Sequence, residues 1–159
     1  MPPRTQNLLI ANIGVFVLQM LLGGDIVAWF ALWPLESGMF RPWQVLSYAL
    51  LHANFSHLFF NMLGIWMFGI ELERVLDAEL VALLLLASVL TAAVTHIVFN
   101  MVFTPTRVVG ASGATFGLLL AYGVFFAERV VEPIFPPIPM KTKYFVAIFG
   151  VIELVSGVG

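Results

Sequence analysis

The sequence contains no cysteine, and this absence excludes disulfides, catalytic thiolates and metal sites built on cysteine. Charge is also scarce, because only 10% of the 159 residues are charged, whereas soluble domains carry about 25%. The net charge of −2 offers no basic surface to a nucleic acid. Apolar residues, in contrast, make up 61% of the chain, and the mean hydropathy is +1.02. The composition therefore predicts a polytopic membrane protein.

Apolar runs mark five candidate membrane spans, and helices are the expected form because lipid cannot satisfy the edge of an open sheet. The spans are expected at residues 8–22, 55–70, 80–103, 108–127 and 144–158. Only Arg4 precedes the first run as a basic residue, and no clear Ala-x-Ala cleavage site follows it. We therefore interpret this run as an uncleaved helix rather than a signal peptide. The predicted fold class is an all-α bundle of membrane helices.

The basic residues divide unevenly between the two sides of this topology. With a cytoplasmic N-terminus, the inner side holds Arg4, Arg74, Arg129, Lys141 and Lys143, and the outer side holds Arg41 and Arg107. Cytoplasmic loops carry an excess of basic residues in membrane proteins. The distribution therefore predicts that the N-terminus lies in the cytoplasm.

Two loops differ in composition. Residues 23–44 should lie outside and contain five aromatic side chains: Trp29, Phe30, Trp33, Phe40 and Trp43. We expect this loop to rest in the membrane interface, with a simple aromatic belt as the alternative. Residues 132–143 hold prolines and lysines and are interpreted as a cytoplasmic linker without chemistry.

Polar side chains gather where two of the predicted spans begin. His57 and Asn61 are four residues apart at the start of the second span and share a helix face, and His52 should lie just before that helix. Ser112 stands in the run Gly-Ala-Ser-Gly at the start of the fourth span. Because both spans begin on the outer side, we expect His57, Asn61 and Ser112 to lie at a similar depth in the outer leaflet.

This combination of residue types is suited to acyl transfer. A serine becomes a nucleophile when a base and an oxyanion pocket lie nearby. Asn61 and His57 offer N–H donors, and a helix N-terminus at Ser112 favours negative charge. The alternatives are hydrogen bonds that only tie helices together, and a metal site. The metal site is disfavoured because no outer carboxylate completes it and His-Glu-x-x-His is absent.

Small residues recur every four positions after the serine, at Gly113, Gly117 and Ala121. Such a stripe is typical of close helix packing, which is our main interpretation. The same stripe would also allow a helix that carries a base to approach Ser112.

The residues from His52 to Asn61 resemble the second-helix signature of rhomboid proteases, His-x4-His-x3-Asn. The run from Gly110 to Gly113 resembles the Gly-x-Ser-Gly motif of the same family. The segment Arg-Pro-Trp-Gln at 41–44 is similar to the one that precedes the second helix in many bacterial members, and Glu-Leu-Glu-Arg at 71–74 is similar to the charged cap after it. The resemblance covers nearly the whole chain.

Rhomboids are intramembrane serine proteases, so the resemblance implies that Ser112 is the nucleophile that attacks a transmembrane segment of a substrate. It implies an oxyanion hole formed by His57, Asn61 and Ser112. It also implies three residues that shape the site, namely His52, Gly110 and Gly113. No metal or cofactor is implied. The expected partners are the transmembrane helices of membrane-protein substrates and the lipid bilayer, and the expected location is the bacterial inner membrane with the active site toward the outer leaflet.

Two features depart from the family pattern. Many members have arginine after the loop tryptophan, whereas Gln44 follows Trp43 here, so an anchoring role of that arginine is not transferred. The family base is a histidine on a sixth helix, whereas this chain ends at Gly159 in the fifth span. We therefore expect a single rhomboid-like domain over residues 1–159 that comprises five helices of a six-helix core and is incomplete at its C-terminus.

The remaining candidate base within the chain is His96, which lies near the outer end of the third span. We interpret it as a histidine hydrogen-bonded to a neighbouring helix and predict that it does not touch Ser112. The missing sixth helix should carry a histidine and small residues that pack on Gly113 and Gly117.

Three functions follow from these patterns. The leading hypothesis is a rhomboid-type serine endopeptidase, inactive or nearly so without its sixth helix. The second is a non-catalytic rhomboid-like protein that binds transmembrane helices, although such a protein has no need to keep the serine and oxyanion residues together. The third is a small channel or transporter, which is least favoured because Glu153 is the clear candidate for an intramembrane acid.

Overall fold

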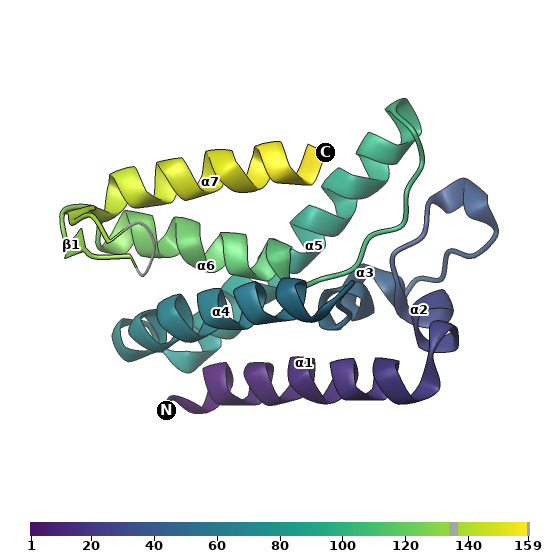
Figure 1. Ribbon diagram of the computed structural model, residues 1–159, viewed down its shortest axis with the longest axis horizontal. Coiled ribbons are helices and arrows are strands. Elements are labelled where there is room, and N and C mark those ends of the chain that lie inside the picture. Colours follow the sequence, from purple (N-terminus) through teal and green to yellow (C-terminus); the bar gives the residue numbers. More distant parts are fainter. Residues whose placement is uncertain (134–136, 159) are drawn as a thin grey trace.

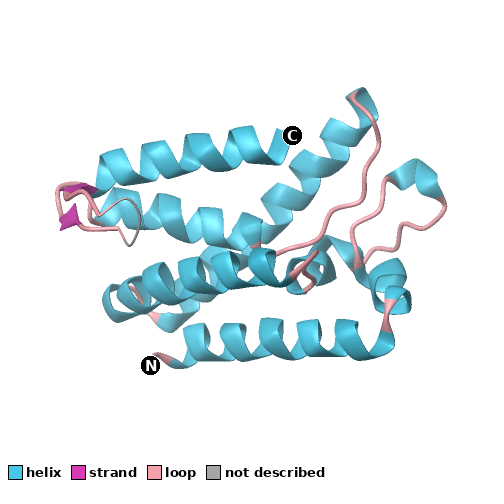
Figure 2. Ribbon diagram, in the orientation of Figure 1, coloured by secondary structure: helices cyan, strands magenta, loops and turns pink. Residues whose placement is uncertain are grey.

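The computed structural model describes residues 1–133 and 137–158, with the side chains of 152–158 excepted. The main helices are α1 (Pro3–Leu22), α4 (Phe55–Val75), α5 (Ala78–Val102), α6 (Ser112–Phe125) and α7 (Thr142–Val158). Short helices α2 (Gly24–Phe30), η1 (Leu35–Ser37), α3 (Gln44–Ser47) and η2 (Tyr48–Leu50) fold the loop between α1 and α4. Strands β1 (Val130–Val131) and β2 (Met140–Lys141) form an antiparallel hairpin. The predicted all-α fold is confirmed (Figure 2).

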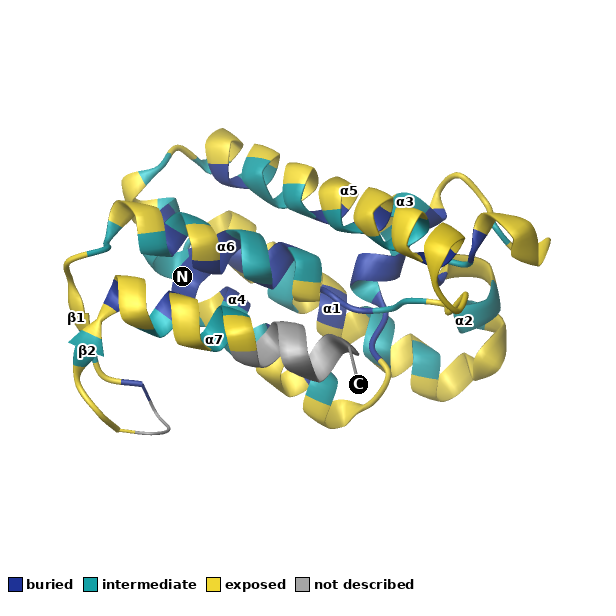
Figure 3. Cartoon of the chain, turned by 90° about the horizontal axis from the view of Figure 1, so that it is seen from above, coloured by how far each residue is buried: buried dark blue, intermediate teal, exposed yellow. Residues whose placement is uncertain are grey.

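Helix α6 is the centre of the bundle, because it packs against α4, α5 and α7, and α4 in turn packs against α1 (Figure 1). The principal core cluster includes Ile65 and Leu72 of α4 and Leu118 and Leu119 of α6, all of which are buried. Buried residues are concentrated on α4 and α6, whereas α5 has a long exposed face (Figure 3). The outer faces of the bundle are apolar, as expected for a protein surrounded by lipid.

The helix lengths distinguish α6 from the long helices. Helices α1, α4 and α5 have 20, 21 and 25 residues and are long and apolar enough to cross a membrane. Helix α6 has 14 residues, which at about 1.5 Å per residue gives about 21 Å against a hydrocarbon core of about 30 Å. Helix α6 and the stretch Thr142–Val151 of α7 are shorter apolar helices.

The predicted fourth span, residues 108–127, is therefore wrong at its beginning. Val108 forms an isolated antiparallel bridge with Leu32, and Gly110 has a φ of 122°, which a helix does not allow. The Gly110 N–H donates instead to the carbonyl of Tyr48 at 2.9 Å. The helix can start only after this residue, at Ser112.

The first helix starts earlier than predicted, at Pro3 rather than at residue 8. Proline suits the first turn of a helix, where its missing N–H has no partner to lose. The Glu73 carboxylate of α4 accepts hydrogen bonds from the Arg4 N–H and the Thr5 N–H, each at 2.9 Å, and from Thr5 Oγ1 at 2.8 Å. A carboxylate at this end of a helix satisfies unpaired N–H groups and complements the helix dipole.

The charged residues 71–74, which were predicted to follow the second span, lie in the last turns of α4 and join it to the segment after α6. Arg129 Nη1 lies 2.9 Å from Glu71 Oε2. The start of α1, the end of α4 and the end of α6 therefore lie on one side of the bundle, as the predicted topology requires. On the opposite side, the Arg107 guanidinium lies 5.4 Å from the centre of the Trp33 ring.

Gln44 organises the loop between α1 and α4. Its side chain is completely buried, and Oε1 accepts from the N–H groups of Arg41 at 3.0 Å and Trp33 at 3.4 Å. Nε2 donates to the carbonyls of Met39 at 3.0 Å and Trp29 at 3.3 Å. The residue that departs from the family pattern thus joins four backbone groups of the loop. That this loop rests in the membrane interface stays a prediction.

The small-residue stripe of α6 faces α5. A Cβ atom at Gly113 would lie 2.7 Å from Ala92 Cβ, and one at Gly117 would overlap Ser88 Oγ and lie 2.6 Å from its Cβ. The interpretation of close helix packing is confirmed for these two glycines. The contacts at these two positions are made by α5, and the packing of a sixth helix on them stays a prediction.

Replacement of Gly117 by alanine should reduce the stability of the bundle. The added methyl group overlaps Ser88, so we expect the free energy of unfolding to fall by about 1–3 kcal/mol. The matched control is Gly14→Ala in α1, where nothing lies within 4 Å of the added Cβ. Thermal unfolding in detergent micelles measures both, and equal midpoints for the two variants would contradict the contact.

Replacement of Gln44 by alanine should loosen the loop between α1 and α4. The N–H groups of Trp33 and Arg41 lose their acceptor, so their hydrogen exchange should accelerate by about tenfold, as for a loss of about 1.4 kcal/mol. The control is Gln6→Ala, at an exposed glutamine of α1. Unchanged exchange at both amides would show that other contacts hold the loop.

Candidate active site

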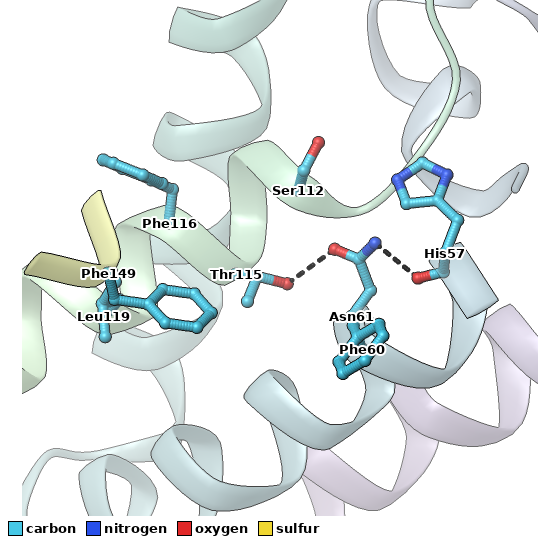
Figure 4. A pocket seen from close by; sticks show the side chains of 8 residues that line it. All are labelled: His57, Phe60, Asn61, Ser112, Thr115, Phe116, Leu119 and Phe149. Atoms are coloured by element: carbon cyan, nitrogen blue, oxygen red, sulfur yellow. Dashed lines mark hydrogen bonds between the residues drawn. The ribbon is translucent and has the colours of Figure 1, made fainter. Parts of the chain in front are cut away.

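A pocket of about 180 Å³ lies where α4, α6 and α7 meet (Figure 4). Its polar lining consists of His57, Asn61, Ser112 and Thr115. Its apolar lining consists of Phe60, Phe116, Leu119 and Phe149. The structure thus brings together the three residues that the topology places at one depth, His57, Asn61 and Ser112. Thr115 and the four apolar residues were not predicted.

Ser112 is the first residue of α6 and is exposed to this pocket. The residue before it, Ala111, is the N-cap and has no side-chain acceptor for the first N–H groups of the helix. The first-turn N–H groups have no partners within a helix, and the helix dipole is positive at this end. The start of α6 therefore favours negative charge beside the Ser112 hydroxyl.

His57 is placed by the first turn of α4. The Asn54 side chain caps this helix by accepting from the His57 N–H at 2.8 Å. The ring nitrogen Nδ1 accepts from the Ala53 N–H at 3.4 Å, so the neutral ring carries its proton on Nε2. A Cβ at Gly110 would lie 2.5 Å from His57 Cε1 and 2.8 Å from Nε2. Glycine is therefore required at 110 both for its φ and for the approach of the His57 ring.

Asn61 is held at both ends of its amide (Figure 4). Nδ2 donates to the His57 carbonyl at 2.8 Å, and Oδ1 accepts from Thr115 Oγ1 at 3.1 Å. Thr115 Oγ1 also lies 3.1 Å from the carbonyl of Ala111. Since a primary amide has two N–H donors, Nδ2 retains one beyond its bond to His57. Thr115 lies one turn after Ser112, and this spacing is the signal by which the sequence could have revealed it.

His52 lies against His57 rather than in the pocket lining. Its side chain is 1% exposed, and the two imidazole rings meet edge to face with their centres 5.2 Å apart. Gln19 of α1 binds both the N–H and the carbonyl of His52, at 2.9 and 3.0 Å. Burial and the neighbouring His57 lower the pKa of His52 to about 4, so the ring is neutral at pH 7.

The two remaining predicted residues lie elsewhere. Gly113 faces α5, as described above. His96 Nε2 lies 3.0 Å from the carbonyl of Thr106, and Asn100 binds the N–H and carbonyl of the same residue. The expected hydrogen bond of His96 is therefore present, but its partner belongs to the loop before α6 and not to a helix. His96 does not line the pocket of Ser112. The side chain of Glu153 lies outside the described residues.

The chain was compared with known protein families and with curated proteins. A model described as the rhomboid domain matches residues 39–159. Rhomboid protease GlpG of Klebsiella pneumoniae is 33% identical over 96 residues, which cover 59% of this chain and 35% of the relative. Rhomboid protease GlpG of Yersinia pestis is 29% identical over 133 residues, or 82% of this chain and 45% of the relative.

Rhomboid protease GluP of Bacillus subtilis is 38% identical over 77 residues, which cover 48% of this chain and 14% of the relative. The chain thus spans less than half the length of each of these relatives. The domain match covers more than half of the chain itself, including the pocket and both motifs. This integral membrane protein belongs to the rhomboid family.

Proposed function

We propose that the chain forms the nucleophile and oxyanion part of an intramembrane serine endopeptidase. The observation that carries the proposal is the pocket that joins Ser112, at the start of α6, to His57 and Asn61 of α4. The similarity to proteins named rhomboid proteases supports the same chemistry.

In the proposed reaction, Ser112 Oγ attacks the carbonyl carbon of a peptide bond while a base removes its proton. The carbonyl oxygen becomes an oxyanion that accepts hydrogen bonds from the Ser112 N–H, from Asn61 Nδ2 and from His57 Nε2. The carbon–nitrogen bond then breaks, the amine takes the proton from the base, and water hydrolyses the acyl-enzyme. One oxyanion donor is typically worth about 3–4 kcal/mol in such a transition state.

Thr115 is proposed to position Asn61 rather than to touch the substrate. Its hydroxyl binds Asn61 Oδ1, so the amide is held with Nδ2 on the side of His57, where Nδ2 binds the His57 carbonyl. A side chain that is fixed before the reaction loses little entropy when the oxyanion forms. His52 and Gly110 are proposed to shape the site by packing on the His57 ring.

The base is proposed to be a histidine from a sixth helix outside residues 1–159. Apart from His57, the chain contains His52, which is buried, and His96, which binds Thr106. General-base catalysis typically contributes about 10²–10⁴-fold to the rate. Residues 1–159 alone should therefore show little or no proteolysis.

The proposed substrates are transmembrane segments of membrane proteins, and the proposed location is the bacterial inner membrane. The N-terminus is proposed to be cytoplasmic because the five basic residues of the inner side lie at the end of the bundle opposite the pocket. With α6 shorter than the bilayer core, Ser112 would lie below the outer surface, within reach of a helix in the membrane. The alternative remains a non-catalytic protein that binds such helices in the same pocket.

Labelling of the full-length protein by a fluorophosphonate should distinguish the two functions. We expect covalent labelling of the wild type and none of Ser112→Ala, because the probe requires an activated serine. The control is Ser56→Ala, at an exposed serine of the first turn of α4. An unlabelled wild type would favour the non-catalytic function, and a labelled Ser112→Ala would place the nucleophile elsewhere.

Replacement of Asn61 by alanine should lower kcat by about 10²-fold or more with little change in KM, because an oxyanion donor acts in the transition state. Thr115→Val keeps the shape of the side chain but removes the hydroxyl that fixes Asn61. Its kcat should fall by a smaller factor. In the double variant the two losses should not add, because Thr115 acts through Asn61. Additive losses measured on a transmembrane substrate would contradict this positioning role.

A further inference from the structure

A second hollow, of about 880 Å³, lies at the end of the bundle where α1 and α5 begin. It is lined by Arg4 of α1, by Asp77 and Glu79 at the start of α5, and by leucines of α5. Its volume lies in the range of small-ligand pockets, about 300–1,000 Å³. The hollow is separate from the pocket of Ser112 and shares no lining residue with it.

The hollow presents both signs of charge to a ligand. Arg4 is fixed through its backbone N–H, which binds Glu73, while its guanidinium makes no ion pair with a carboxylate of the described residues. Asp77 is the N-cap of α5, yet its side chain makes no capping hydrogen bond. Glu79 is exposed in the first turn of the same helix. Arg4, Asp77 and Glu79 therefore line the same hollow, but neither carboxylate forms an ion pair with the guanidinium.

The other wall of the hollow is apolar and continues along α5. Leu80, Leu83 and Leu86 lie three residues apart and are 51%, 61% and 45% exposed. From Leu80 to Leu86 the helix rises by about 9 Å. This row of leucines leads from the charged residues at the start of α5 along a helix that is long and apolar enough to cross a membrane. A ligand that matches the whole hollow therefore has a charged head and a long apolar chain.

We propose that this hollow binds a zwitterionic aminophospholipid, with its phosphate on Arg4 and its ammonium group on Asp77 and Glu79. An acyl chain then lies along the leucine row. Guanidinium groups bind phosphate through parallel charged hydrogen bonds, and a primary ammonium group offers three N–H donors to the carboxylates.

The same charges discriminate between lipids. A phosphatidylglycerol brings a phosphate to Arg4 but no cation to Asp77 and Glu79, whose negative charges oppose it. A phosphatidylcholine brings a positive charge without an N–H donor, so it cannot hydrogen-bond the carboxylates. The expected order of affinity is phosphatidylethanolamine, then phosphatidylcholine, then phosphatidylglycerol.

The first test uses the wild-type protein and lipids with identical acyl chains. Phosphatidylethanolamine, its N-methyl and N,N-dimethyl derivatives and phosphatidylcholine form a series in which N–H donors are lost one at a time. Native mass spectrometry from detergent micelles measures the fraction of protein that retains each lipid. We expect retention to fall along the series, by about fivefold in total for hydrogen bonds partly exposed to water. Equal retention of the four lipids would overturn the proposal without any need for a variant.

The second test assigns the site with variants of the full-length protein. Arg4→Gln should lose retention of all phospholipids, and Asp77→Asn with Glu79→Gln should lose the preference for phosphatidylethanolamine over phosphatidylglycerol. Matched controls are Arg74→Gln and Glu132→Gln, which change the same charges outside the hollow. Wild-type preference in both hollow variants, or the same loss in the controls, would show that the lipid binds elsewhere.

Discussion

The pocket depends on the contact between α4 and α6 at Asn61 and Thr115. The Thr115 hydroxyl donates to Asn61 Oδ1 at 3.1 Å, and one turn further along α4 a Cβ at Gly64 would lie 2.5 Å from Thr115 Cγ2. The hydrogen bond between Thr115 and Asn61 requires the close approach of α4 and α6 at Gly64, because a side chain at Gly64 would separate the two helices. In lipid an unpaired amide or hydroxyl is costly, so this pair both joins the helices and fixes the geometry of the pocket. Other contacts of α6 then place Ser112 relative to Asn61.

The segment before α6 is the second constraint, since it delivers Ser112 below the ends of the longer helices. Its backbone is bound along its length: Thr106 by Asn100, Val108 by Leu32, and Gly110 by Tyr48. Extended backbone within a membrane protein is tolerated where the protein itself satisfies its polar groups. The loop between α1 and α4 supplies part of that protein, and Gln44 holds this loop together.

Much of this arrangement could be predicted from the sequence because topology restricts where side chains can meet. Two spans that begin on the same side bring His57, Asn61 and Ser112 together without any knowledge of packing. The start of α6 could not be predicted from hydropathy, because residues 108–111 are as apolar as the helix that follows. The φ of Gly110 and its bond to Tyr48 decide the boundary, and both are set by tertiary contacts.

The roles of Thr115 and Gln44 were missed for a related reason. A threonine in an apolar helix and a glutamine after a tryptophan have no distinctive pattern, and their importance lies in partners on other segments. The glycine stripe shows the converse case, because its spacing predicts close packing but not the identity of the helix that packs on it. The spacing of the glycines shows that a helix can pack closely on this face of α6, but the path of the chain decides that this helix is α5.

In the function that we propose, the pocket must reconcile two opposed demands. An oxyanion hole needs hydrogen-bond donors that await a ligand, whereas lipid penalises polar groups without partners. Here the acceptors near Ser112 are already occupied: Asn61 Oδ1 by the Thr115 hydroxyl, the His57 carbonyl by Asn61 Nδ2, and the Ala111 carbonyl by the Thr115 N–H. Because these acceptors already have donors, the polar groups that face a ligand in the pocket are mainly N–H donors, and they lie at the positive end of the α6 dipole. Such a pocket attracts developing negative charge through N–H dipoles that are fixed before the reaction, which is the form of electrostatic stabilisation that costs a membrane protein least.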